Sequence, residues 1–269
     1  LVCRRTDDGA VVWSVDTSRR YGVVQNFFGV GSSPLVLDDL VIVMVGGSPP
    51  EDQDLPPMRL DRVIPNGSAA VAFDLADGSS RWTCGDDLAS YSSPIRVDID
   101  GKPFVMLFAR GGLLLIDPDD GQVRWRWDHR AAKLESVNAM TPIVDGNRVL
   151  ISECYEVGAA LLEFDELGAK AVWQDPPRLR RRQAMRSHWA TPIKIGDAVY
   201  GCSGRNGPDS DLRCIDWSTG KVRWVDRRRI RSSLTRVGDL LIVLEERGRL
   251  EIVRANPDRF DPIATYDFG

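Results

Sequence analysis

The chain of 269 residues is longer than an average domain, but repeat architectures and all-β folds reach this length as single units. Hydrophobic residues make up 43% of it, enough for a large core, and the net charge of −4 argues against nucleic-acid binding, which needs a basic surface. No apolar run approaches the roughly 18 residues of a membrane span.

One motif recurs along the chain: an apolar strand ending in Asp, a short turn ending in Gly, three residues and then Trp. An Asp side chain can accept hydrogen bonds from its own turn, and Gly tolerates the positive φ that a hairpin requires. The fourth copy has a shortened turn, and the first has Arg5 in place of Asp. In chain order the copies are Cys3…Gly9…Trp13, Asp74…Gly78…Trp82, Asp117…Gly121…Trp125, Asp165…Gly168…Trp173, Asp216…Gly220…Trp224 and a degenerate copy over 252–266 with Tyr266 in the Trp position.

A second motif, a Ser/Thr-Pro pair before a hydrophobic strand, precedes the motif Trp residues from Trp82 onward by 32 to 49 residues. Its copies are Ser33-Pro34, Ser93-Pro94, Thr141-Pro142, Thr191-Pro192 and, without Pro, Ser232-Ser233-Leu234. Each is followed by a turn and a second strand with β-branched or aliphatic residues. These second strands are predicted at 40–45, 104–108, 149–152, 199–202 and 240–244.

The spacing of the motif Trp residues is 69, 43, 48 and 51. A period near forty-five with four short strands is typical of propeller blades, so we predict an all-β β-propeller of four-stranded antiparallel blades. Each Trp is expected to pack over the neighbouring blade. The longest interval contains a Pro-rich insertion at 46–67, which is interpreted as a solvated flap, with a cap over the binding face or a contact with a partner as the alternatives. The chain is predicted to form one incomplete domain with a partial blade at 1–16 and full blades at 28–83, 88–126, 136–174, 187–225 and 228–267.

The copy Cys214-x-Asp216-x-x-Thr219-Gly220-x-x-x-Trp224 is the most complete. It resembles the pyrroloquinoline quinone (PQQ)-like β-propeller repeat, which quinoprotein alcohol dehydrogenases share with the outer-membrane assembly lipoprotein of the β-barrel machinery. The resemblance covers 1–269 and implies a periplasmic or other extracytoplasmic bacterial protein. It also implies an eight-bladed ring, so further blades and an export signal are expected upstream of Leu1. Similarity to planctomycete-type members of the superfamily lies in Val45–Pro50, Leu88–Pro94, Ile151–Tyr155 and Leu212–Cys214.

In a propeller, the connections between blades share one rim with the B–C loops, whereas the A–B and C–D turns share the other. The C–D turns of this chain are stereotyped, while the loops of the opposite rim differ in every blade. Because loops on a rigid scaffold are the usual place for binding, we predict a ligand pocket on this variable rim. The alternative is that its polar groups satisfy one another and bind water. The predicted pocket residues are Arg110, Asn138, Glu153, His188, Arg205 and Asn206.

The remaining reactive residues carry weaker signals. His188 is a candidate ligand contact or pH-sensitive group, whereas His129, at a strand end, is expected at the surface. The spacing of the five Cys residues fits neither a disulfide framework nor a zinc site. Strand packing is expected for Cys3 and Cys214, and Cys202 could face Cys214 across a hairpin. The basic run over 178–182 is interpreted as a solvated loop, with a polyanion site as the alternative.

Two functions stay open. The first is a non-catalytic scaffold that binds a protein, a cell-envelope component or a small-molecule ligand and needs no cofactor, metal or catalytic residue. The second, implied by the resemblance, is a PQQ-dependent dehydrogenase, in which carboxylate and amide oxygens hold Ca²⁺ and an Asp acts as base. Glu153 and Asn206 could supply such oxygens, but no Asp base stands beside them and no adjacent Cys pair is present. We therefore favour the scaffold.

Overall fold

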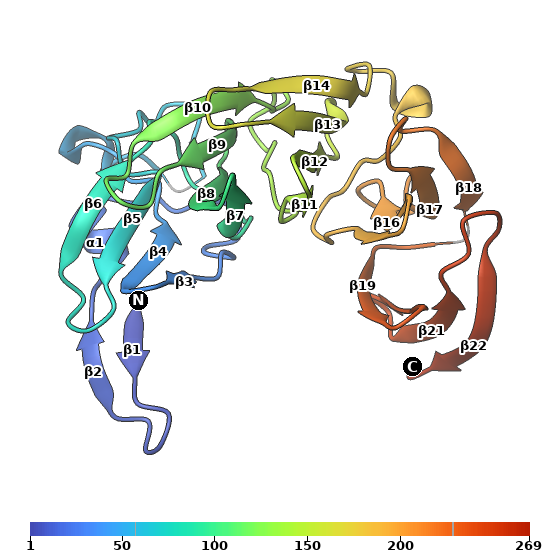
Figure 1. The fold of residues 1–269 in the computed structure, drawn as a ribbon, viewed down its shortest axis with the longest axis horizontal. Helices are drawn as coiled ribbons and strands as arrows, with labels where there is room; N and C mark the ends of the chain where they lie inside the picture. Colours follow the sequence, from blue (N-terminus) through green and yellow to red (C-terminus); the bar gives the residue numbers. More distant parts are fainter. Residues whose placement is uncertain (57, 228) are drawn as a thin grey trace. The chain divides into compact units, whose positions relative to one another are not determined.

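A computed structural model describes residues 1–56, 58–227 and 229–269 (Figure 1). The chain divides into two compact units: unit 1 comprises 1–138 and 166–168, and unit 2 comprises 139–165 and 169–269. Pro57 of the predicted insertion and Arg228, where the last predicted blade begins, lie outside the described residues. Each unit is built from antiparallel sheets in which strands that follow one another in sequence are neighbours.

Unit 1 contains a two-stranded sheet, β1-β2, and the four-stranded sheets β3–β6 and β7–β10. The α-helix in the described part of this unit, α1 (Thr17–Tyr21), begins at Asp16, whose side chain accepts the N–H of Arg19, and ends at Gly22 in the left-handed conformation. The strands are β1 (Val2–Arg4), β2 (Val11–Ser14), β3 (Leu35–Leu37), β4 (Leu40–Met44), β5 (Ala70–Asp74), β6 (Ser80–Cys84), β7 (Ile95–Ile99), β8 (Lys102–Phe108), β9 (Gly112–Ile116) and β10 (Val123–Asp128).

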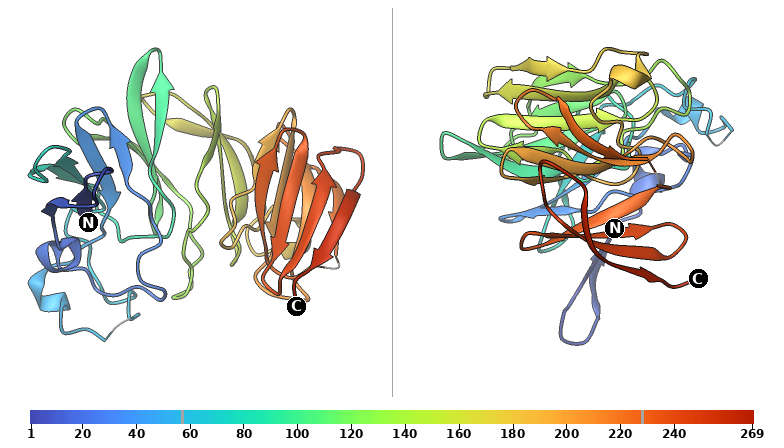
Figure 2. Two further views of the ribbon diagram at one scale, coloured as in Figure 1. Left: turned by 90° about the horizontal axis from the view of Figure 1, so that it is seen from below. Right: turned by 90° about the vertical axis from the view of Figure 1, so that its right-hand side faces the viewer.

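Unit 2 contains three four-stranded sheets, β11–β14, β15–β18 and β19–β22, and Figure 2 shows the last of these as four adjacent strands. The second strand of every full blade lies within two residues of its predicted bounds. The strands are β11 (Ile143–Asp145), β12 (Arg148–Glu153), β13 (Gly158–Phe164), β14 (Ala169–Gln174), β15 (Ile193–Ile195), β16 (Ala198–Ser203), β17 (Asp211–Asp216), β18 (Val222–Asp226), β19 (Ser232–Val237), β20 (Leu240–Glu245), β21 (Arg249–Arg254) and β22 (Asp261–Asp267).

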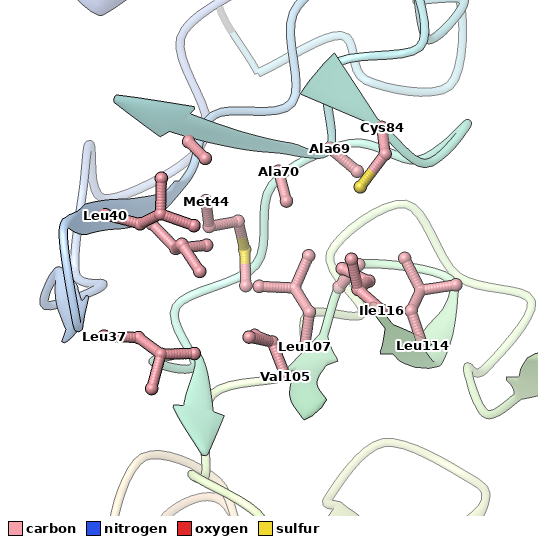
Figure 3. Packing of buried hydrophobic residues seen from close by; sticks show 13 residues of the cluster. Leu37, Leu40, Met44, Ala69, Ala70, Cys84, Val105, Leu107, Leu114 and Ile116 are labelled. Atoms are coloured by element: carbon pink, nitrogen blue, oxygen red, sulfur yellow. The ribbon is translucent and has the colours of Figure 1, made fainter. Parts of the chain in front are cut away.

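Inner strands are buried on both faces, which explains their continuous apolar runs. On β4, Ile42 and Met44 belong to a cluster that joins the two full sheets of unit 1, and Figure 3 shows Met44 beside Leu107. The alternate residues Val41 and Val43 pack on the other side with Trp13. Stacking of the sheets of unit 1 therefore buries aliphatic side chains of β4 on both faces, at about 1.5–3 kcal/mol for each side chain.

The predicted docking of Trp on the neighbouring blade is confirmed for four copies. In each, the indole Nε1 donates a hydrogen bond to a carbonyl in or near the C–D turn of the next sheet. The four bonds join Trp13 to Leu75 (2.9 Å), Trp82 to Pro118 (2.8 Å), Trp173 to Trp217 (2.8 Å) and Trp224 to Asn256 (2.9 Å).

The turn Gly serves two purposes in these contacts. Gly78, Gly121 and Gly220 all adopt a positive φ, as the hairpin requires. A Cβ at any of the three would also lie 2.6–2.8 Å from the indole docked on it. Gly168 of the shortened copy does not adopt a positive φ, so this turn departs from the repeat.

The turns also carry an Arg that the motif analysis did not use. This Arg precedes the docking Trp and pairs with the turn Asp at 2.8 Å for Arg81–Asp74 and 2.6 Å for Arg223–Asp216. The Asp side chain accepts turn N–H groups as expected, for example from Ala76 to Asp74 at 2.9 Å. The three copies that carry this Arg (Arg81, Arg124 and Arg223) therefore form an Asp-Gly-Arg-Trp unit, in which the ion pair holds the turn against the outer strand.

Several single-residue expectations are settled by the structure. His129 is 1% exposed, so its predicted surface position is wrong: its ring centroid lies 5.9 Å from that of Phe108. Cys214 lies opposite Tyr200 and Cys202 opposite Leu212, so the two Cys residues are not cross-strand partners. All five Cys residues are free thiols, and Cys3 and Cys214 lie in strands as expected.

The insertion at 46–67 is folded onto unit 1. Leu60 and Val63 are buried in a cluster with Leu88. Asp52 accepts the N–H of Ile64 at 2.7 Å, which closes the insertion on itself. Its apolar contacts therefore differ from those expected of a fully solvated flap.

Candidate functional site

Within each unit, blade connections lie against B–C loops, as the rim argument predicts. In unit 1, the Asn138 amide donates to the carbonyls of Ala109 (2.9 Å) and His129 (3.0 Å), which joins the connection to the β8–β9 loop. In unit 2, the Gly204 N–H donates to the Arg186 carbonyl at 2.8 Å. This surface of each unit is called the variable rim below.

The six predicted pocket residues are divided between the units. Arg110 and Asn138 belong to unit 1, and the other four belong to unit 2. Arg110 is 2% exposed and donates to the Leu134 carbonyl at 2.7 Å. Burial and the charge of Arg130 lower the pKa of Arg110 to about 10. Both unit 1 residues are held inside the protein, where Asn138 cross-links loop carbonyls.

Glu153 is committed to the local structure of the β12–β13 turn. Its side chain accepts backbone N–H groups from Tyr155 (2.7 Å), Glu156 (2.9 Å) and Val157. Both carboxylate oxygens are thus used, and the residue is 1% exposed. Asn206 is exposed on the loop after β16. These two side chains do not fit a Ca²⁺ and PQQ centre, and no group of at least three His, Cys, Asp or Glu among the described residues could hold a metal ion.

Three of the predicted residues meet at Tyr155, which the prediction had left out. We call Glu153, Tyr155, His188 and Arg205 the Tyr155 cluster. The Tyr155 hydroxyl lies 3.3 Å from Nε2 of His188, and the Arg205 guanidinium lies 5.2 Å from the Tyr155 ring centroid. Burial, followed by the charges of Arg205 and Arg231, lowers the pKa of His188 to about 4. The imidazole is therefore neutral at pH 7.

A pocket of about 180 Å³ adjoins this cluster on the variable rim, and we call it the Trp189 pocket. His188 stacks on Trp189 with ring centroids 4.7 Å apart, and the Arg231 guanidinium lies 4.1 Å from the Trp189 ring centroid. Arg231 also pairs with Glu246 at 2.6 Å, and Trp189 is 47% exposed. The pocket thus offers an aromatic face between a buried imidazole and a cation.

The predicted pocket included His188 but neither Trp189 nor Arg231. The sequence did contain a signal for Trp189: its position in the repeat. Trp189 follows no Asp-Gly turn, so it cannot serve as a docking Trp. Arg231 gave no such signal, since it comes from the next blade and meets Trp189 only in the folded unit.

The four-stranded sheets, docked Trp residues and variable rim define a protein of the β-propeller class built from PQQ-like repeats. The family model described as outer membrane protein assembly factor BamB matches residues 1–226. The chain therefore belongs to this family. No curated protein matches the sequence. The described helices are all too short or too polar to cross a membrane.

Solved structures with the same fold include BamB and two dehydrogenases. BamB from Moraxella catarrhalis is 16% identical with a TM-score of 0.63, and the match covers 97% of this chain and 65% of that one. A europium-containing methanol dehydrogenase is 12% identical with a TM-score of 0.58, covering 92% and 52%. A quinohemoprotein alcohol dehydrogenase from Pseudomonas putida HK5 is 13% identical with a TM-score of 0.58, covering 96% and 44%. At these identities, the likeness establishes the fold alone.

Proposed function

We propose that this chain is a non-catalytic binding scaffold of the bacterial cell envelope that holds a protein partner on its variable rim. The observation that supports this most directly is the Trp189 pocket, where a half-exposed indole is clamped by Arg231. Trp and Arg are the residues most often found at binding hot spots, because they combine a large apolar face with directional donors. The periplasmic location and the protein partner are carried over from the family as part of the proposal.

The polar residues near the pocket support binding more than chemistry. Glu153 holds a turn, His188 is neutral and buried, and Arg205 covers Tyr155. A dehydrogenase of the quinoprotein type needs free oxygens for Ca²⁺ and an Asp base, which this cluster does not offer. We therefore expect no cofactor. Incubation with PQQ and Ca²⁺ should give neither quinone absorbance nor alcohol-dependent dye reduction, and either signal would overturn the non-catalytic assignment.

The binding proposal is tested by site-specific photo-crosslinking in a bacterial envelope fraction. A photoreactive residue replaces Trp189, and a matched one replaces Val237, which is 56% exposed at the end of β19, beside the A–B turn of the last blade on the opposite rim. We expect a protein adduct of discrete mass from position 189 alone.

A second arm uses a neighbour of the pocket. Placing the photoreactive residue at Ser233, which lines the same pocket, allows Trp189→Ala to be tested in the same chain. The adduct should weaken by roughly thirtyfold when the Trp anchor is removed, since losing a hot spot costs about 2 kcal/mol or more. Equal adducts from both rims, or an adduct that survives Trp189→Ala, would contradict the proposal. If no protein adduct forms and a small molecule is crosslinked instead, the natural ligand of the pocket belongs to the class of that small molecule.

A further inference from the structure

A second pocket on unit 2, which we call the arginine pocket, has a volume of about 360 Å³ and shares no lining residue with the Trp189 pocket. It lies between the connection that follows β14, the loop before β17 and the residue after β18. Two Asp side chains, Asp209 and Asp211, line it together with five Arg side chains, which gives the pocket a formal charge of +3 in a chain of −4 overall. The five are Arg180, Arg181, Arg186, Arg213 and Arg227.

Both carboxylates are already matched by buried guanidinium groups. Arg186 makes a two-pronged contact with Asp209, at 2.8 Å to Oδ2 and 2.9 Å to Oδ1. Arg213 donates from Nε to Asp211 at 2.6 Å. Burial raises the pKa of Asp209, but its hydrogen bonds and charge contact with Arg186 outweigh this and leave the pKa below its usual range. The two pairs therefore form a rigid, locally neutral wall.

The excess positive charge lies on other side chains. Arg181 and Arg227 are exposed at the pocket, and within 1–56, 58–227 and 229–269 neither has a carboxylate partner. Arg180 is 3.7 Å from Asp209, which Arg186 already occupies at shorter range. Guanidinium groups that converge without a counter-charge repel one another, so an anion between them would relieve that repulsion.

Two buried polar atoms at the same pocket also lack a partner among the described residues. They are the hydroxyl of Ser210 and Nε of Arg186, on residues that are 1% and 4% exposed. Leaving such a group unpaired when it is buried is unfavourable, because it has lost its hydrogen bonds to water. Ser210 lies next to Asp209 in the wall, and its hydroxyl can turn to donate to an acceptor oxygen.

We propose that the arginine pocket binds a phosphate-class oxyanion, with Arg181 and Arg227 as the principal contacts. The guanidinium group matches tetrahedral oxyanions through paired N–H donors, which an isolated Lys does not. The volume falls in the range of pockets for small organic ligands, so there is room for a molecule that carries the phosphate. This develops the alternative for the basic run at 178–182, and it goes beyond the proposed protein-binding function.

The test is calorimetric titration of the 269-residue chain with inorganic phosphate at low ionic strength. Arg181→Ala combined with Arg227→Ala should weaken phosphate binding by roughly a hundredfold, since each of the two lost charged hydrogen bonds contributes about a factor of ten. The matched control combines Arg182→Ala with Arg259→Ala, which removes the same charge from exposed residues that do not line the pocket. The control should bind phosphate as the parent chain does.

Vesicle flotation distinguishes the two possible sources of the anion, a lipid headgroup and a soluble phosphate compound. Vesicles with phosphatidylglycerol should float the parent chain, but not the double variant, if a lipid headgroup is the natural ligand; otherwise only soluble phosphate should bind. Either result supports an oxyanion site. The proposal is overturned if the parent chain shows no saturable phosphate binding, or if the pocket and control variants bind alike. Crosslinking at position 189 is unaffected by either outcome, so this site and the proposed function fail independently.

Discussion

His188 is a titratable side chain that is held neutral inside the Tyr155 cluster. Its folded pKa of about 4 lies below the value of about 6.5 for an unfolded His, because burial and two nearby Arg charges disfavour the imidazolium. Between these two pH values the unfolded chain binds more protons, so the stabilising contribution is complete above pH 6.5 and is lost as pH falls toward 4.

We therefore predict that lowering the pH from 7.5 to 4.5 costs the parent chain about 2–3 kcal/mol more unfolding free energy than it costs His188→Gln. Gln fills a similar space and can hydrogen-bond Tyr155 but does not titrate. The measurement is urea unfolding across this pH range for both chains. Carboxylates that titrate below pH 5 affect the two chains equally, so parallel pH profiles would show that His188 is not desolvated as described.

At the residue scale, the candidate site was only partly predictable. Glu153, His188 and Arg205 could be selected because polar residues in variable loops stand out, and they do meet at Tyr155. Asn138 could not be recognised as buried, since an Asn that bridges loop carbonyls has the same local sequence as one that faces a ligand. The packing of neighbouring blades determines which side chains meet, and no local sequence pattern shows that packing.

At the element scale, the C–D turn joins one blade to the next, and its Gly supports both the hairpin and the indole. Gly121 and Gly146 both adopt a positive φ, at 77° and 58°. A Cβ on Gly121 would lie 2.8 Å from the Trp82 ring, whereas a Cβ on Gly146 would meet no atom within 4 Å. Substituting Gly146 therefore tests backbone strain alone, whereas substituting Gly121 tests backbone strain together with loss of Trp docking.

We predict that Gly146→Ala lowers the unfolding free energy by about 1 kcal/mol, from backbone strain alone. Gly121→Ala should lower it by about 2–4 kcal/mol, because displacing the docked indole adds an overpacking cost. Urea unfolding monitored by Trp fluorescence measures both. An equal effect of the two substitutions would mean that the indole does not rest on the turn.

The elements themselves were predictable to within a residue or two, because short strands with β-branched residues are punctuated by fixed turns. The strand at 199–202, for instance, forms as Ala198–Ser203. The insertion was not predictable: its Leu60 and Val63 cannot be distinguished from solvated residues until Leu88 is brought beside them. The outlier Gly168 shows the limit of the repeat, because a shortened turn no longer needs the left-handed residue.

At the scale of the whole molecule, the stability of each repeat depends on its contacts with the repeats next to it. Within each unit, neighbouring sheets contact one another through docking Trp residues, so the stability of such a repeat array is approximately the sum of repeat and interface contributions. Trp224 joins sheet β15–β18 to sheet β19–β22 through its bond to Asn256 and through Phe260, whose ring centroid is 5.8 Å away. A substitution at this interface should therefore destabilise the two sheets that share it more than the other sheets.

We predict that Trp224→Ala, which removes a large apolar contact worth about 3–5 kcal/mol, lowers hydrogen-exchange protection in β15–β22. Sheet β3–β6 of unit 1 contains neither partner of the interface, so its protection should stay at the parent level. Trp189→Ala is the matched control, because it removes a half-exposed indole that docks on no turn and should leave exchange in every sheet unchanged. Mass spectrometry of exchanged peptides resolves the sheets. A uniform loss of protection from β1 to β22 would mean that the chain unfolds as one cooperative body, in which case nearest-neighbour docking does not govern its stability.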